Sequence, residues 1–109
     1  MPRLKRRKLR KFNNQPITVR GVFARFGAHP TPHGLARTML VTDVTRARDN
    51  RPLCDHVWIH YHYGKPAPFQ PGDRIQFRAL VRSYHESERH NGYTLCKPTN
   101  IKVIQEIAP

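Results

Sequence analysis

The chain has 109 residues, enough for one domain with a modest hydrophobic core. Its 20 Lys and Arg outnumber its 7 Asp and Glu, and the net charge of +13 favours a polyanionic partner, nucleic acid above all. No apolar run is long enough to cross a membrane and none follows the basic start as in a signal peptide, so we expect a cytoplasmic protein without a membrane partner.

The first segment, residues 1–14, is a basic tail. Seven cations lie in residues 1–11 with no acid among them, so the rest of the chain keeps a net charge of +6 (+13 less +7). Because like charges repel, we expect this tail to be disordered when free. It would contact phosphates by releasing counterions, in particular through Lys5, Arg6, Arg7 and Lys8. The alternative is a solubilising or localising tail that makes no specific contact.

The remainder, residues 15–105, reads as β-strands joined by turns, with a short tail at 106–109. The first predicted strand contains Gly21, and an isolated glycine in a strand marks a bulge or a bend. Residues 27–36 hold two prolines and two glycines and are predicted to form a loop. The predicted strands span residues 16–26, 37–45, 53–63, 73–84 and 93–104.

The third predicted strand alternates strictly. Val57, Ile59, Tyr61 and Tyr63 fall on one side, which suits a core. The other side is a row of flat rings that could stack nucleic-acid bases: His56, Trp58, His60 and His62. The alternative is the inverted register, in which the only tryptophan is buried.

The fourth predicted strand also has two rows. Its core row is Ile75, Phe77, Ala79 and Val81, and its outer row is rich in arginine. Asn91-Gly92 is a hairpin signal ahead of the fifth strand, in which Pro98 predicts a bulge or an edge position. Residues 64–72 contain three prolines, and no helix is predicted there or elsewhere. Five strands without a helix favour a small closed antiparallel barrel, which leaves no exposed edge.

Three motifs carry a resemblance to a known fold family. They are Val19-Arg20-Gly21-Val22, the run Met39-Leu40-Val41-Thr42-Asp43-Val44, and Pro71-Gly72-Asp73-Arg74-Ile75. With the aromatic third strand they resemble the OB-fold, an all-β, five-stranded antiparallel Greek-key barrel, over residues 16–105. The chain departs from the family at the Pro-rich segment, where many members have a helix that plugs the barrel. Phe69 is the candidate substitute for that plug.

The resemblance implies single-stranded nucleic-acid binding, with single-stranded DNA favoured, in DNA replication, recombination or repair. The alternatives are an RNA-binding or ribosome-associated protein, or an OB module that docks onto a polymerase, primase or helicase. In the family the ligand crosses strands two and three, which implies a platform of Trp58, His60 and His62, with His56 in the same row. The residues implied around it are His29, His33, Arg37, Tyr84, His85, Arg89, His90 and Tyr93, then Arg46, Arg48 and Arg51 in the turn between strands two and three, and Arg20 and Arg78.

Other kinds of chemistry find little support. No nucleophile elbow, phosphate-cradling loop or paired carboxylates are present, so the sequence predicts a binding protein without catalytic residues or a cofactor. His56, His60 and His62 invite a metal interpretation, which is weaker because no cysteine falls on their row. Cys54 and Cys96 read as small buried residues rather than a disulfide. The oligomeric state is left open by the sequence.

Overall fold

The structure, a computed structural model, describes residues 9, 11–61, 68–87 and 90–105, with side chains except at 83–87 and 90–92. It is all-β, as predicted, and its helical part among these residues is a 3₁₀ turn at Leu9, Lys11 and Phe12. All five strands pair antiparallel, in the order β3-β2-β1-β4-β5. The strands are β1 (Pro16–Thr31), β2 (Gly34–Arg46), β3 (Pro52–His60), β4 (Arg74–Ser87) and β5 (His90–Gln105).

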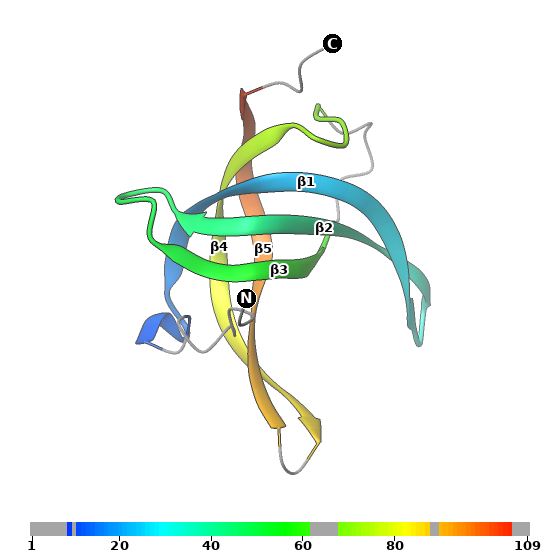
Figure 1. Ribbon diagram of the computed structural model, residues 1–109. Helices are drawn as coiled ribbons and strands as arrows, with labels where there is room; N and C mark the ends of the chain where they lie inside the picture. The colour runs from blue at the N-terminus through cyan, green and yellow to red at the C-terminus, as the bar shows by residue number, and fades with distance from the viewer. Residues whose placement is uncertain (1–8, 10, 62–67, 88–89, 106–109) are drawn as a thin grey trace.

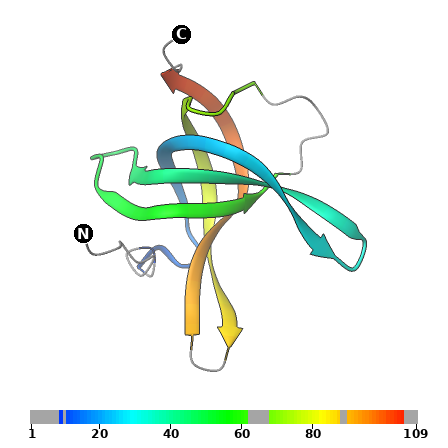
Figure 2. The same cartoon turned by 45° about the vertical axis from the view of Figure 1, so that its right-hand side comes forward.

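The strands form two layers that cross each other (Figures 1 and 2). β1, β2 and β3 make one layer, and β4 and β5 pass behind it. β1 belongs to both, because Pro16–Val22 pair with β4 while Val19–Thr31 pair with β2. Side chains from both layers fill the core between them, so the outer faces of the two layers point away from each other.

The alternation predicted for the core rows is confirmed for the described residues; Tyr63 of the third predicted strand lies outside them. On β3 and just after it, Val57, Ile59 and Tyr61 are buried. On β4, every residue of the predicted core row is buried too. Phe69 is buried as well, with its ring centroid 4.6 Å from that of Phe23 and 5.9 Å from that of Tyr61. The Pro-rich connection therefore contributes an aromatic ring to one end of the core.

The bulge predicted at Gly21 is confirmed. The β1–β2 register shifts between Arg20 and Val22, and Gly21 is buried in the shift. A Cβ atom there would lie 2.4 Å from Cγ1 of Val41 and 2.9 Å from the backbone oxygen of Thr42. Only a residue without a side chain fits where β1 bends this tightly against β2.

Gly21→Ala should therefore destabilise the fold. The added methyl meets backbone as well as a side chain, so the strands themselves must shift, and overpacking of this kind costs about 1–3 kcal/mol. Urea denaturation should show a lower midpoint with an unchanged slope. A midpoint equal to that of the parent protein would contradict the close approach of β1 and β2.

The predictions for two connections, the loop at 27–36 and the turn at Asn91-Gly92, are wrong. Residues 27–36 continue β1 and β2 into a tight hairpin, with Thr31 opposite Gly34, rather than forming a loop. Pro30 fits because this part of β1 pairs with β2 alone, so its missing N–H breaks no hydrogen bond on the other side of the strand. Pro32 lies in the turn itself. Asn91 and Gly92 do not form a turn either: they pair with His85 and Tyr84, because the β4–β5 pairing extends past them to Ser87 and His90, with a register shift between His85 and Ser87.

The prediction that residues 1–14 are disordered is wrong for the described part of that segment. Leu9 is fully buried in the core and Phe12 packs against it. The backbone N–H of Asn14 donates to the oxygen of Val81 over 2.8 Å, which ties the segment to β4. Leu9 and Phe12 are three residues apart, a spacing that aligns side chains on a 3₁₀ turn. Lys5, Arg6, Arg7 and Lys8 lie outside the described residues.

The predicted closed barrel is also wrong, because the sheet stays open between β3 and β5. The β4–β5 pairing shifts register at four places, and two of these shifts place irregular residues of β5 near Lys97-Pro98 and near Asn100. Lys97 and Asn100 have φ values of 52° and 55°, and Pro98 has no N–H to donate. A strand interrupted in this way does not present a continuous row of donors and acceptors to β3. Pro98 thus lies in a bulged edge strand, as predicted.

Candidate nucleic-acid interface

Trp58 lies on the outer face of the β1–β2–β3 layer, which confirms the predicted register of β3. Its side chain is 36% exposed, whereas Val57 and Ile59 on either side of it are fully buried. Trp58 pairs with Leu40 of β2, and Leu40 pairs with Arg25 of β1. A large aromatic ring is therefore presented on the surface of three hydrogen-bonded strands.

The indole of Trp58 reaches across β2 to the backbone of β1. A Cβ atom on Gly27 would lie 2.8 Å from Cζ3 and 3.1 Å from Cη2 of the indole. The missing side chain of Gly27 is what allows the ring to reach this close to the sheet. The guanidinium carbon of Arg25 lies 5.2 Å from the ring centroid, within the range of a cation–π contact.

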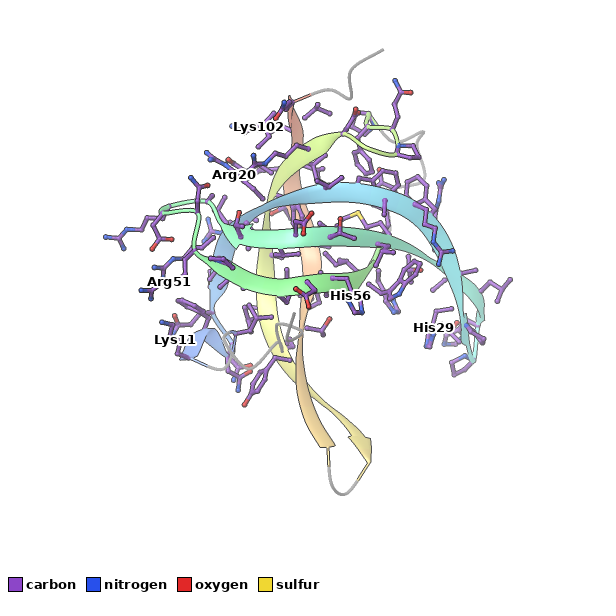
Figure 3. All side chains as sticks on the ribbon, viewed as in Figure 1. Lys11, Arg20, His29, Arg51, His56 and Lys102 are labelled. Carbon is purple, nitrogen blue, oxygen red and sulfur yellow. The ribbon has the colours of Figure 1, made fainter. Side chains whose placement is uncertain are left out.

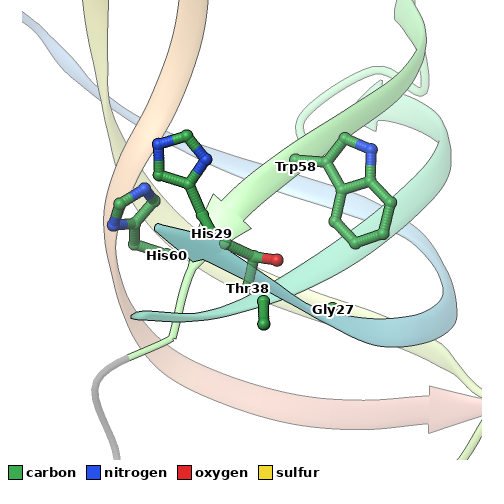
Figure 4. A pocket seen from close by; sticks show the side chains of 6 residues that line it. Gly27, His29, Thr38, Trp58 and His60 are labelled. Carbon is green, nitrogen blue, oxygen red and sulfur yellow. The ribbon is translucent and has the colours of Figure 1, made fainter. Parts of the chain in front are cut away.

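A hollow of about 390 Å³ opens beside the indole. Trp58 forms one wall (Figure 4), and His29 and His60 form the other, with their ring centroids 5.7 Å apart. Gly27 and Thr38 lie between the walls, and Ala28 completes the lining. We call this hollow the aromatic slot. Arg25 is not part of its lining among the described residues, so its guanidinium contacts Trp58 from outside the slot.

The register of three strands assembles the slot. Gly27 of β1 pairs with Thr38 of β2, which pairs with His60 of β3, so the three lie in one row across the sheet. His29 follows Gly27 by two residues and Trp58 precedes His60 by two, which places each pair on one face. The slot therefore depends on the extension of β1 and β2 beyond the residues predicted as strand.

Arg37, predicted to border the platform, points elsewhere. Its guanidinium carbon lies 3.9 Å from the ring centroid of Phe26 and 5.9 Å from that of Tyr61. Both rings pack at the same end of the core as Phe69. Arg37 thus covers the end of the core rather than lining the slot.

The three arginines predicted from the β2–β3 turn lie at the far end of the β2–β3 ribbon from the slot. Figure 3 shows Arg51 and His29 at opposite ends of this layer. Arg46 is paired with Asp49: its Nε donates to Oδ1 over 2.9 Å, its Nη2 bonds Oδ2, and this pair holds the pKa of Asp49 well below its usual range. Arg48 and Arg51 are exposed.

The other predicted residues are scattered. His56 is half-buried on β3, Tyr93 is half-buried against the core, and His33 is exposed at the tip of the β1–β2 hairpin. Arg20 and Arg78 lie on the outer face near β4, where Nε of Arg20 donates to Oε1 of Gln76 over 2.8 Å. The remaining ones fall outside the described residues or have undescribed side chains: His62, Arg89, Tyr84, His85 and His90.

Sequence reasoning missed Gly27 and Thr38 in the slot, and Arg25 beside it. Arg25 was inside the first predicted strand, but nothing in the pattern linked it to Trp58. Gly27 was assigned to a loop and Thr38 to a strand without a role. These residues could have been found from strand pairing, because a β-hairpin centred on Pro32-His33 places Gly27 opposite Thr38.

Comparison with protein-family models, curated proteins and solved structures finds no match for this chain. Within the described part of the chain, no helix is long and apolar enough to cross a membrane. In the same part, no three potential ligands are grouped in a way that would hold a metal ion.

Proposed function

We propose that the chain binds single-stranded nucleic acid, single-stranded DNA in preference, by stacking a base between Trp58 and the His29–His60 pair. The observation that carries the proposal is the aromatic slot, a surface hollow with rings on two sides in a protein of net charge +13. Base stacking on aromatic rings within a positively charged surface is how proteins hold single strands without reading their sequence.

The position of the slot supports an OB-type binding site. The order β3-β2-β1-β4 supports a Greek-key arrangement, in which three consecutive strands are followed by a fourth beside the first. OB domains are partly open Greek-key barrels that bind oligonucleotides on strands two and three and the loop between strands one and two. The slot takes residues from β2, β3 and the β1–β2 hairpin.

Arg25 supplies a cation next to the stacking ring. Its guanidinium lies against Trp58 from outside the slot and its side chain is exposed. A phosphate that flanks a base in the slot would come within reach of this charge. Replication, recombination or repair is the setting in which we expect such a protein to act.

Oligonucleotides without bases test the stacking step directly. We expect oligo-dT to bind the protein more tightly than an abasic strand of the same length, by roughly tenfold or more, because stacking contributes about 1–3 kcal/mol per base. Fluorescence anisotropy at two salt concentrations measures both affinities. Equal affinities would show that the protein holds phosphates alone. Oligo-rU in the same series establishes whether RNA binds more tightly than DNA.

Gly27→Ala should narrow the slot without removing any charge. The new methyl would sit within 3.1 Å of the indole and of Oγ1 of Thr38, so Trp58 must tilt away from the sheet. We expect a weaker affinity for oligo-dT in anisotropy titrations and a nearly unchanged melting temperature, because the atoms that yield are at the free end of a side chain. Affinity for the abasic strand is the control and should not change. An unaltered oligo-dT affinity would contradict base binding in the slot.

A further inference from the structure

The outer face of the β4–β5 layer is a second surface with its own chemistry. Odd-numbered residues of β4 fill the core, so its even-numbered residues face outward. Gln76 pairs with Arg20 of β1 on one side and Lys102 of β5 on the other, and Figure 3 shows both cations at the edge of the molecule. We define the cationic face as Arg20, Arg74, Arg78, Arg82 and Lys102 with the neutral polar side chains between them, Thr18, Gln76, Thr94 and Thr99.

No carboxylate offsets these charges among the described side chains. The described acids are Asp43 on β2, Asp49 in the β2–β3 turn, Asp55 on β3, and Asp73, which is 3% exposed just before β4. Arg20 is held by the neutral amide of Gln76 rather than by an acid. Within the part of the chain that the structure describes, no ion pair joins a cation of this face to an acid, and the one ion pair found there is that of Arg46 with Asp49 in the β2–β3 turn.

The cationic face offers no aromatic ring for stacking among its described side chains. Phe77 of β4 is buried, and Tyr93 of β5 is half-buried against the core. Arg, Lys, Thr and Gln side chains are the groups that contact phosphates and sugars, and such contacts do not need unpaired bases. A double helix carries one charge per roughly 1.7 Å of its axis, a dense array for such a face.

We propose that the cationic face binds the phosphate backbone of double-helical nucleic acid, so that the chain holds a single strand and a duplex on opposite sides. The single-strand half of this arrangement rests on the function proposed above, and the duplex half does not. The two layers cross each other (Figure 1) and share the core between them, so their outer faces point away from each other, which leaves room for both ligands at once. The chain would then act where a single strand lies close to a duplex.

A pair of matched double variants tests the duplex surface in the full-length chain. Arg78→Gln with Lys102→Gln removes two exposed cations from the cationic face, and Arg48→Gln with Arg51→Gln removes two exposed cations from the β2–β3 turn. For a blunt duplex, the first variant should flatten the slope of log affinity against log salt by about 1.8, since each phosphate contact contributes about 0.9. The turn variant should change the slope less. Equal changes would overturn the proposal, because charge alone would then explain them.

A bridging assay tests simultaneous binding. Oligo-dT on beads should retain a labelled blunt duplex when the parent protein is present, and the Arg78/Lys102 variant should lose that duplex while staying on the beads. Trp58→Ala should leave the beads but keep its affinity for the duplex in solution. Retention of protein without duplex by the parent would overturn the proposal. Failure of the parent to bind oligo-dT would instead refute the single-strand function, and the duplex titrations would still decide the role of the cationic face.

Discussion

Trp58→Ala should weaken the binding of oligo-dT by roughly tenfold or more. Removing a ring on which a base stacks costs about 1–3 kcal/mol, and 1.4 kcal/mol is a factor of ten. The melting temperature should change little, because Trp58 is 36% exposed and lies on the surface of the sheet, so its loss leaves no closed cavity. Anisotropy titration and a thermal melt of the same sample measure both quantities.

Leu35→Ala is the matched control for this experiment. Leu35 is 76% exposed on the β1–β2 hairpin, which contributes Gly27 and His29 to the slot, but Leu35 itself does not line the slot, so its truncation removes surface apolar area without touching the site. We expect neither affinity nor melting temperature to change. If Trp58→Ala instead unfolded the protein and kept its affinity in the folded fraction, Trp58 would be a structural residue and the slot would not be the binding site.

Leu9→Ala should have the largest effect on stability. Leu9 is fully buried in a segment that carries seven cations in its first eleven residues. Truncating a buried leucine costs about 2–5 kcal/mol, from lost transfer free energy and from the cavity left behind. Small domains are stable by only about 5–15 kcal/mol in total, so a large share of the folding free energy depends on this one side chain.

Urea denaturation of Leu9→Ala and Leu9→Met measures how much of the stability depends on the apolar volume at position 9, because only the first substitution removes that volume. Leu9→Met keeps the apolar volume and should cost less than about 1.5 kcal/mol. A parent-like midpoint for Leu9→Ala would show that the N-terminal turn does not pack in solution. Deleting residues 1–11 would remove Leu9 together with the charges, so we expect that deletion to destabilise the fold as well.

The parts of the fold that the sequence predicts well are those set by one local pattern. Period-two alternation alone places Val57 and Ile59 inside and Trp58 outside, because each strand has one face on the core. An isolated glycine in a strand marks the bulge at Gly21 for a similarly local reason. The same alternation also places Trp58, which forms one wall of the slot, on the outer face of β3. It places His60, which forms the other wall together with His29, on that face too.

The parts that sequence reasoning missed depend on pairing with distant residues. Prolines near His29 suggest a loop, yet they are tolerated because β1 has only one neighbour there. That extension brings His29 and Gly27 to the slot. Leu9 was missed because the surrounding charge hides a two-residue apolar pattern, Leu9 and Phe12. Arg37 was predicted to border the platform because it begins the second predicted strand. That position alone does not tell on which face of the sheet its side chain lies.

The fluorescence of Trp58 tests the central claim most directly, because it is the only tryptophan and stands in the proposed site. Oligo-dT should quench its emission at low salt, and the quenching curve should give the same affinity as anisotropy. The abasic strand of equal length should leave the emission unchanged even where it binds. Saturated binding of oligo-dT by anisotropy, without any change in the tryptophan emission, would contradict stacking in the aromatic slot.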